Sequence, residues 1–118
     1  MKDKEIKRLI REYMKWWVRH TGAGFWRVNM RWEEVIEWED GHLDTAAFCT
    51  CDWKYEEATI TFALSRLRNL KKWEIESAVV HEIMHIFLNE TREKGIEHEE
   101  RIATQLAKAF IWVRDAKK

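Results

Sequence analysis

Two histidines and a glutamate interrupt a strongly apolar stretch of this chain. Residues 79–88 read Val-Val-His-Glu-Ile-Met-His-Ile-Phe-Leu, so the pattern H-E-x-x-H falls on His81, Glu82 and His85. Apolar neighbours on every side are typical of a buried helix. Burying three polar side chains without partners costs several kcal/mol, and either a metal ion or hydrogen bonds within the core must offset that cost. We predict a metal ion, so the fold must bring a further ligand to this helix.

The spacing of the motif suits a metal site. Residues four apart stack on one face of a helix, so His81 and His85 can reach the same ion. Glu82 lies about 100° round the helix axis from His81, which places it beside the ion. Zinc held by two neutral imidazoles and one carboxylate keeps a position open for water and lowers the pKa of that water to about 7. We therefore predict that His81 and His85 bind Zn²⁺ and that Glu82 is the catalytic base.

The third ligand is expected from the last helix, where four candidate side chains stand together. The metzincin pattern H-E-x-x-H-x-x-G-x-x-H would supply a third histidine from the motif helix itself. That pattern is excluded, because Leu88 occupies its glycine position and Thr91 its last histidine position. The remaining candidates at the start of the last helix are Glu97, His98, Glu99 and Glu100.

Two physical arguments about this third ligand disagree. Helix geometry favours Glu99, because Glu99 lies at the centre of the apolar stripe of its helix. Side-chain size favours Glu100, because Ala103 and Ala107 on its side would let the helix approach the motif helix closely. His98 is a further candidate, which would make a three-histidine site. The apolar stripe consists of Ile102, Ala103, Leu106 and Phe110.

The remaining hydrophobic periodicity predicts an α+β fold in a single domain, residues 1–118. Helical spacing begins the chain and ends at Gly22 and Gly24. Period-two alternation then predicts a small three-stranded antiparallel sheet, and the helical pattern returns for the motif helix and a closing helix. The closing helix carries an apolar stripe at Ile102, Leu106, Phe110 and Val113. The predicted elements are a helix over 3–20, strands over 25–35, 45–55 and 58–64, a turn over 39–42, and helices over 72–89 and 96–114.

Composition and charge narrow the class of protein. The 118 residues include 21 basic and 21 acidic side chains, a balance that does not favour an electrostatic nucleic-acid binder. The chain start has no signal-peptide core, and no stretch reaches the roughly 18 apolar residues of a membrane span. We therefore expect a cytoplasmic protein with no membrane partner. Cys49 and Cys51 are expected to be buried thiols, since a strain-free disulfide between strand positions two apart is unfavourable.

These features together resemble a minimal gluzincin-type zincin, similar to the ImmA/IrrE-type peptidases and the small zincin-like metallopeptidases of phage and prophage. Those proteins share the order of an N-terminal helix, an antiparallel sheet, an H-E-x-x-H helix and a C-terminal glutamate helix. Their ligand glutamate belongs to E-x-x-A-N-x-F-A, which Glu-Arg-Ile-Ala-Thr-Gln-Leu-Ala at 100–107 resembles. The match implies Glu100 as ligand. Thr104 stands where the pattern has Asn, so the hydrogen bond to a ligand histidine is expected to be altered. A site using His98 would instead resemble the SprT-like class.

The resemblance implies a zinc metallopeptidase that hydrolyses peptide bonds. Glu82 would take a proton from metal-activated water and return it to the leaving amine. The substrate is expected to be an extended peptide on the edge strand near residues 45–55, and Tyr55 or His98 are candidates to stabilise the oxyanion. Two alternatives remain: a zinc-binding regulatory module without turnover, and a zinc-free interaction protein with a tryptophan-rich surface. The oligomeric state is left open.

Overall fold

The computed structural model describes residues 1–38, 45–93 and 98–116, and over these residues it has four α-helices and three strands. The α+β class is confirmed. Every predicted helix and strand forms, with ends shifted by a few residues, whereas the short elements η1 and α2 were not predicted. The predicted turn over 39–42 lies outside the described residues. In chain order the elements are α1 (Asp3–Thr21), η1 (Ala23–Phe25), β1 (Arg27–Glu33), β2 (Ala47–Asp52), β3 (Glu57–Ala63), α2 (Leu64–Leu67), α3 (Lys72–Glu93) and α4 (Glu99–Asp115).

Helix α1 is amphipathic and packs one face into the core. Ile6, Ile10, Met14 and Trp17 are all buried on this face, at the spacing expected of a surface helix. The helix ends at Gly22, whose φ of 85° lies in the left-handed region that glycine adopts without a steric cost. The chain can therefore turn sharply into η1 and enter the sheet.

The three strands form a mixed sheet, so the prediction of an antiparallel sheet is wrong. The strand order is β1-β3-β2, in which β2 pairs with β3 antiparallel and β1 pairs with β3 parallel. The connection after β1 returns the chain at the same end of the sheet, which makes β2 antiparallel to β1. Strand β3 reverses again and inserts between them, so it runs parallel to β1. Its last four residues are all buried, which suits the central position.

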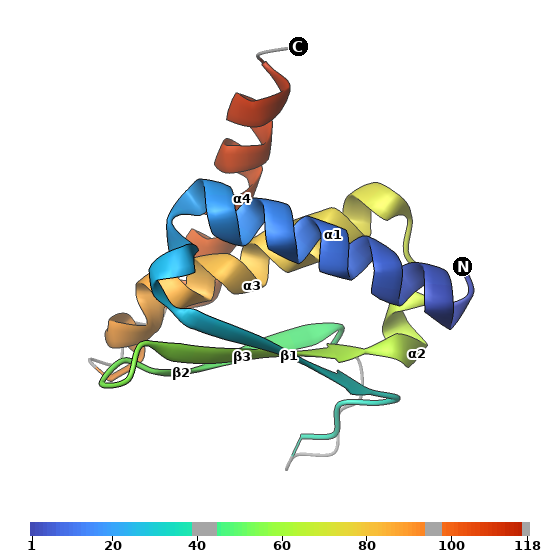
Figure 1. Cartoon of the computed structure of the whole chain (residues 1–118), viewed down its shortest axis with the longest axis horizontal. Helices are drawn as coiled ribbons and strands as arrows, with labels where there is room; N and C mark the ends of the chain where they lie inside the picture. Colours follow the sequence, from blue (N-terminus) through green and yellow to red (C-terminus); the bar gives the residue numbers. More distant parts are fainter. Residues whose placement is uncertain (39–44, 94–97, 117–118) are drawn as a thin grey trace.

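One face of the sheet carries the helices and the other face is polar. Figure 1 shows α1 and α3 lying across the same face of the sheet, and the core lies between these layers. The residues of β1 that point to the opposite face are exposed, namely Arg27, Asn29, Arg31 and Glu33. None of the described helices combines the length and the apolar character needed to cross a lipid bilayer.

Helix α4 packs mainly through Glu99 and two alanines, and the large residues at the edges of its apolar stripe stay exposed. The buried residues of α4 are Glu99, Ala103 and Ala107, whereas Ile102 and Phe110 of the stripe are exposed. Alanines permit a close approach between helix backbones, and the fold uses this face to bring α4 against α3. The C-terminal half of α4 projects away from the sheet (Figure 1), and its Arg114 lies over the Trp17 ring of α1 at 5.2 Å. The stripe argument therefore placed Glu99 and Ala103 correctly on the packed face, but Ile102 and Phe110 lie outside it.

Candidate metal centre

His81 and His85 of α3 converge with Glu100 of α4. The two Nε2 atoms are 3.2 Å apart. One carboxylate oxygen of Glu100 lies 3.0 Å from His81 Nε2, and the other lies 2.7 Å from His85 Nε2. Tetrahedral ligands with bonds of 2.0–2.1 Å stand about 3.3 Å from one another, so the spacing is close to that of a zinc site. His81, His85 and Glu100 therefore form a group that could hold a metal ion.

Each imidazole also has a hydrogen-bond partner at Nδ1, on the side away from Glu100. Thr104 donates its hydroxyl proton to the carbonyl oxygen of Glu100, so its oxygen can accept from His81 Nδ1 at 3.2 Å. His85 Nδ1 lies 2.9 Å from a carboxylate oxygen of Glu99, which can only accept. With a cation held between the two imidazoles and Glu100, both Nδ1 atoms would carry the proton and both Nε2 atoms would present a lone pair.

The donor set fits a bound cation. Two imidazole lone pairs and a carboxylate meet within hydrogen-bond distance of one another, and three acceptors repel unless positive charge lies among them. Burial lowers the pKa of His81 and outweighs the Glu100 carboxylate, which would raise it. Neutral imidazole is the form that binds metal ions. The three side chains could therefore hold a metal ion.

Glu82 approaches the same site from the side. Its carboxylate oxygen Oε2 is 3.9 Å from His81 Nε2, and 7% of the residue is exposed. This distance is beyond a hydrogen bond, and a water molecule beside the two atoms could bridge them from one side with two hydrogen bonds of about 2.8 Å. Glu82 is outside the convergent group formed by His81, His85 and Glu100. Helix geometry predicted that Glu82 lies beside His81, and the fold places it there.

The edge strand β2 borders cavities on both sides of Glu82. A cavity of about 600 Å³ contains Glu82, His85 and Glu100, and a second cavity of about 370 Å³ contains Glu82 and His81. Ala47 of β2 and Glu82 line both, so the metal group opens to solvent along this strand. The walls of the larger cavity also include Trp38, Thr45, Phe48, Cys49 and Thr50.

Trp38 is a cavity residue that the sequence did not indicate. Its indole N–H donates to Thr45 Oγ1 at 2.7 Å, and its ring centroid lies 5.3 Å from that of Phe48. Trp38 follows the strand β1 but lies against the strand β2, and no local pattern signals such a long-range contact. Cys49, also in this wall, forms no disulfide and has its Sγ 3.7 Å from Cys51 Sγ; Cys49 is buried as expected, whereas Cys51 is partly exposed.

The other candidate residues lie away from the convergent group or outside the described residues. His98 accepts from the Arg101 guanidinium at 2.8 Å through Nδ1 and does not join His81 and His85. Tyr55 is exposed in the turn after β2 and does not line either cavity beside the metal group. Glu97 lies outside the described residues. Among the candidates for third ligand that are described, Glu100 faces both Nε2 atoms and Glu99 faces His85 Nδ1.

Comparison with known proteins adds no family assignment. Searches against protein-family models, curated proteins and solved structures return no significant match for this chain. The inference of function is therefore carried by the H-E-x-x-H motif and by the geometry of the three side chains that converge beside it.

Proposed function

We propose that this protein is a zinc-dependent metallopeptidase of the gluzincin type, built on a zincin-like fold. The convergence of His81 Nε2, His85 Nε2 and the Glu100 carboxylate carries the proposal. Two histidines and one glutamate, open to solvent on one side, are the ligand set of catalytic zinc in several peptidases. Bound zinc supplies Lewis acidity, which lowers the pKa of water and polarises a carbonyl group.

Glu82 supplies the proton transfers in this proposal. Its carboxylate is close enough to His81 Nε2 to accept a proton from a water molecule that lies beside both groups. The same carboxyl group, then protonated, gives its proton to the amine that leaves when the peptide bond breaks. Because Glu82 is largely buried, few competing waters reach it.

Supporting side chains hold the two imidazoles in the orientation that this chemistry needs. Glu99 accepts from His85 Nδ1, and Thr104 accepts from His81 Nδ1. Such partners fix the tautomer of a ligand histidine and increase its basicity. Glu99, which helix geometry favoured as ligand, thus acts in this proposal as the orienting carboxylate of His85.

The substrate is an extended peptide that pairs with the edge of β2 opposite β3, where the described part of the chain places no other strand. The carbonyl oxygen of Ala46 accepts from the N–H of Ala63, so Ala46 points its backbone towards β3. Backbone direction alternates along a strand, and Ala47 therefore directs its N–H and C=O groups away from β3. Ala47 also lines the cavity that contains His85 and Glu100. Strand pairing there would lay a substrate main chain beside Glu82.

Metal analysis and a hydrolysis assay test the proposal together. We expect about one zinc ion per chain when the protein is purified without added metal or a metal-binding tag. Hydrolysis of unfolded casein should stop on chelation and return with added zinc. A zinc content near zero after reconstitution would contradict the metal site, whereas bound zinc without hydrolysis would indicate a non-catalytic zinc-binding module.

Removing the Thr104 hydroxyl is expected to weaken zinc binding. We predict that Thr104→Val lowers zinc affinity by about tenfold, because His81 Nδ1 then loses its acceptor. Thr104→Ser keeps the hydroxyl and should bind as the parent protein does. Competition with a chromophoric chelator measures both affinities. Thr21→Val, which removes a hydroxyl at the end of α1, is the matched control. Equal affinities for the Val and Ser variants would remove Thr104 from the site.

A further inference from the structure

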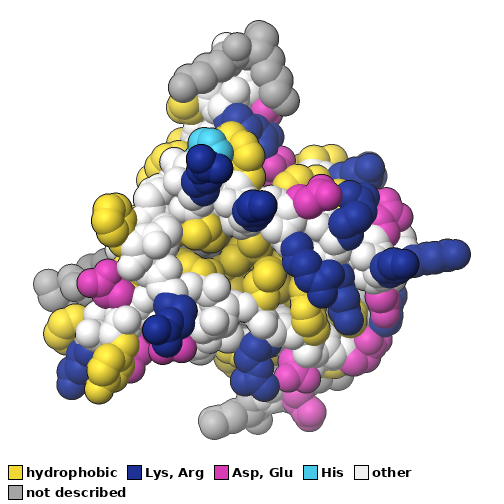
Figure 2. Space-filling model, viewed as in Figure 1, with side chains coloured by type: hydrophobic (Ala, Val, Ile, Leu, Met, Phe, Trp, Pro, Cys, Tyr) yellow, Lys and Arg dark blue, Asp and Glu magenta, His cyan; other side chains and the backbone are white. Residues whose placement is uncertain are grey.

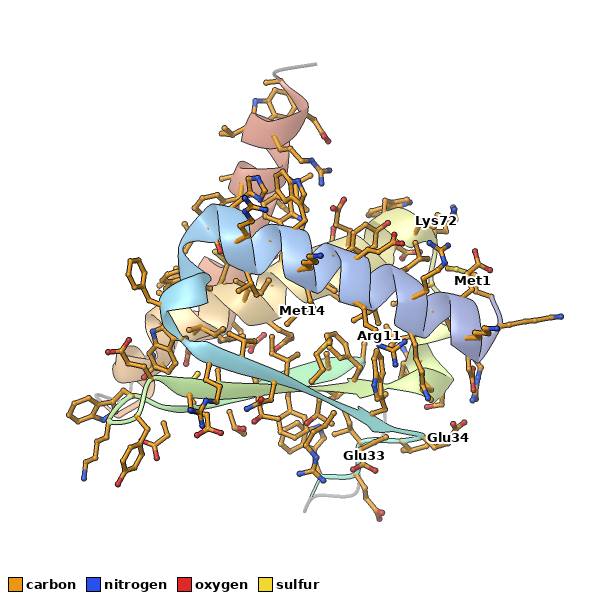
Figure 3. All side chains as sticks on the ribbon, in the orientation of Figure 1. Met1, Arg11, Met14, Glu33, Glu34 and Lys72 are labelled. Carbon is orange, nitrogen blue, oxygen red and sulfur yellow. The ribbon has the colours of Figure 1, made fainter. Side chains whose placement is uncertain are left out.

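A groove between α1 and β1 lies at the edge of the sheet opposite β2. Its cavity measures about 550 Å³ and combines an apolar floor with cationic walls. Figure 2 shows the hollow, with hydrophobic side chains inside and Lys or Arg side chains around it. Figure 3 shows Met14 and Arg11 extending from α1 towards the sheet on this side. The residues that line the groove are Arg11, Met14, Lys15, Val18, Arg19, Gly24, Trp26, Val28 and Met30.

The walls of the groove carry positive charge without a counter-charge. Arg11, Lys15 and Arg19 are spaced four apart along α1 and form one row. No ion pair among the described residues engages any of the three, and the groove lining includes no acidic side chain. The chain as a whole is electrically balanced. The row is therefore a local concentration of charge that complements an anionic ligand.

The floor of the groove ends at an unpaired strand edge. In the described part of the chain β1 pairs with β3 alone. The N–H of Arg27 donates to the carbonyl oxygen of Glu56, so Arg27 points its backbone inward. Alternation then directs the N–H and C=O groups of Val28 and Met30 away from β3. Side chains of these same residues line the groove. An added strand could pair with β1 and contact the apolar floor at once.

We propose that this groove binds an extended acidic segment of a partner protein, which adds as a strand to β1. Its main chain pairs with Val28 and Met30, its apolar side chains enter the groove, and its carboxylates meet Arg11, Lys15 and Arg19. A duplex nucleic acid would contact the cations but could not use the strand edge. A flat membrane surface fits poorly on a concave groove. Binding here is independent of the chemistry proposed for the metal centre.

Fluorescence anisotropy on the full chain tests the groove with a defined probe. The probe is a fluorescein-labelled decapeptide that alternates Glu and Val, and its integrity is checked by mass spectrometry after each titration. We expect saturable binding that weakens when NaCl rises from about 0.05 to about 0.5 M. A Lys and Val peptide should not bind. A Glu and Val peptide that is N-methylated at every residue should lose binding, because neither of its edges can then donate a hydrogen bond to β1.

Paired charge reversals locate the binding site. We expect the double variant Lys15→Glu, Arg19→Glu to bind the probe with about tenfold or more lower affinity. Arg66→Glu with Lys72→Glu, two exposed cations on α2 and α3, makes the same change in net charge and should leave binding unaltered. Lys72 stands at the start of α3, away from the groove (Figure 3). Circular dichroism verifies that both double variants are folded.

Three results would overturn the proposal. Equal affinities for the two double variants would place the peptide elsewhere, and undiminished binding of the N-methylated peptide would exclude strand addition. Displacement of the probe by a lower concentration of a dT12 oligonucleotide would identify the groove as a nucleic-acid site. These measurements do not require zinc or turnover, so their failure is distinct from failure of the metallopeptidase proposal.

Discussion

Replacing Glu100 with alanine is expected to lower zinc affinity by more than about 100-fold. The Glu100 oxygens lie 3.0 Å from His81 Nε2 and 2.7 Å from His85 Nε2, and no other described carboxylate approaches both atoms. The Glu100→Ala variant keeps the two histidines but loses the negative charge that completes the site. Isothermal titration with Zn²⁺, checked by metal content after gel filtration, measures the loss.

Glu99→Ala is the informative comparison for this prediction. Glu99 accepts a hydrogen bond from His85 Nδ1, so the Glu99→Ala variant should misorient the His85 ring. We expect zinc affinity to fall by about 10- to 100-fold, which is less than the fall expected for Glu100→Ala. Glu12→Ala on the exposed face of α1 controls for the change in charge. If Glu99→Ala strips the metal while Glu100→Ala retains it, the assignment of the two carboxylates is reversed.

Replacing Glu82 with glutamine is expected to abolish hydrolysis while zinc remains bound. Glu82 does not converge with the three ligand side chains, so the variant should keep the zinc stoichiometry of the parent protein. Glutamine is nearly isosteric but cannot accept a proton from water, and turnover should fall by about 10²- to 10⁴-fold. The rate of casein hydrolysis and the zinc content are measured on the same preparation.

Glu12→Gln is the matched control for Glu82→Gln, because it makes the same chemical change on a distant exposed helix face. Its rate should equal that of the parent protein. Unchanged hydrolysis in the Glu82 variant would remove this carboxylate from the mechanism. Loss of zinc from that variant would show that Glu82 contributes to metal binding, which its distance from His81 Nε2 does not favour.

The helix that carries the motif could be predicted because its signals are local. His81 and His85 are separated by about one helical turn, and this relation depends on helix geometry alone. The position of Glu82 beside them follows from the same geometry. The helix α1 and the strand β1 could be predicted for the same reason. Within each element, the residues that face the core recur at a fixed spacing along the chain.

The pairing of strands and the choice of carboxylate were decided by tertiary packing. Sequence alternation identified the three strands but did not specify that β3 lies between β1 and β2, because pairing joins residues far apart in the chain.

The rotation of α4 about its axis has the same origin. Adjacent residues differ by about 100° around a helix, so the packed face determines whether Glu99 or Glu100 meets the histidine Nε2 atoms. The apolar stripe alone favoured Glu99. Close packing through Ala103 and Ala107 instead directs Glu100 to both Nε2 atoms and leaves Glu99 to the Nδ1 of His85. The sequence by itself determined the pair of histidines and the glutamate beside them, because these lie on one helix; the third side chain depends on contact between two helices.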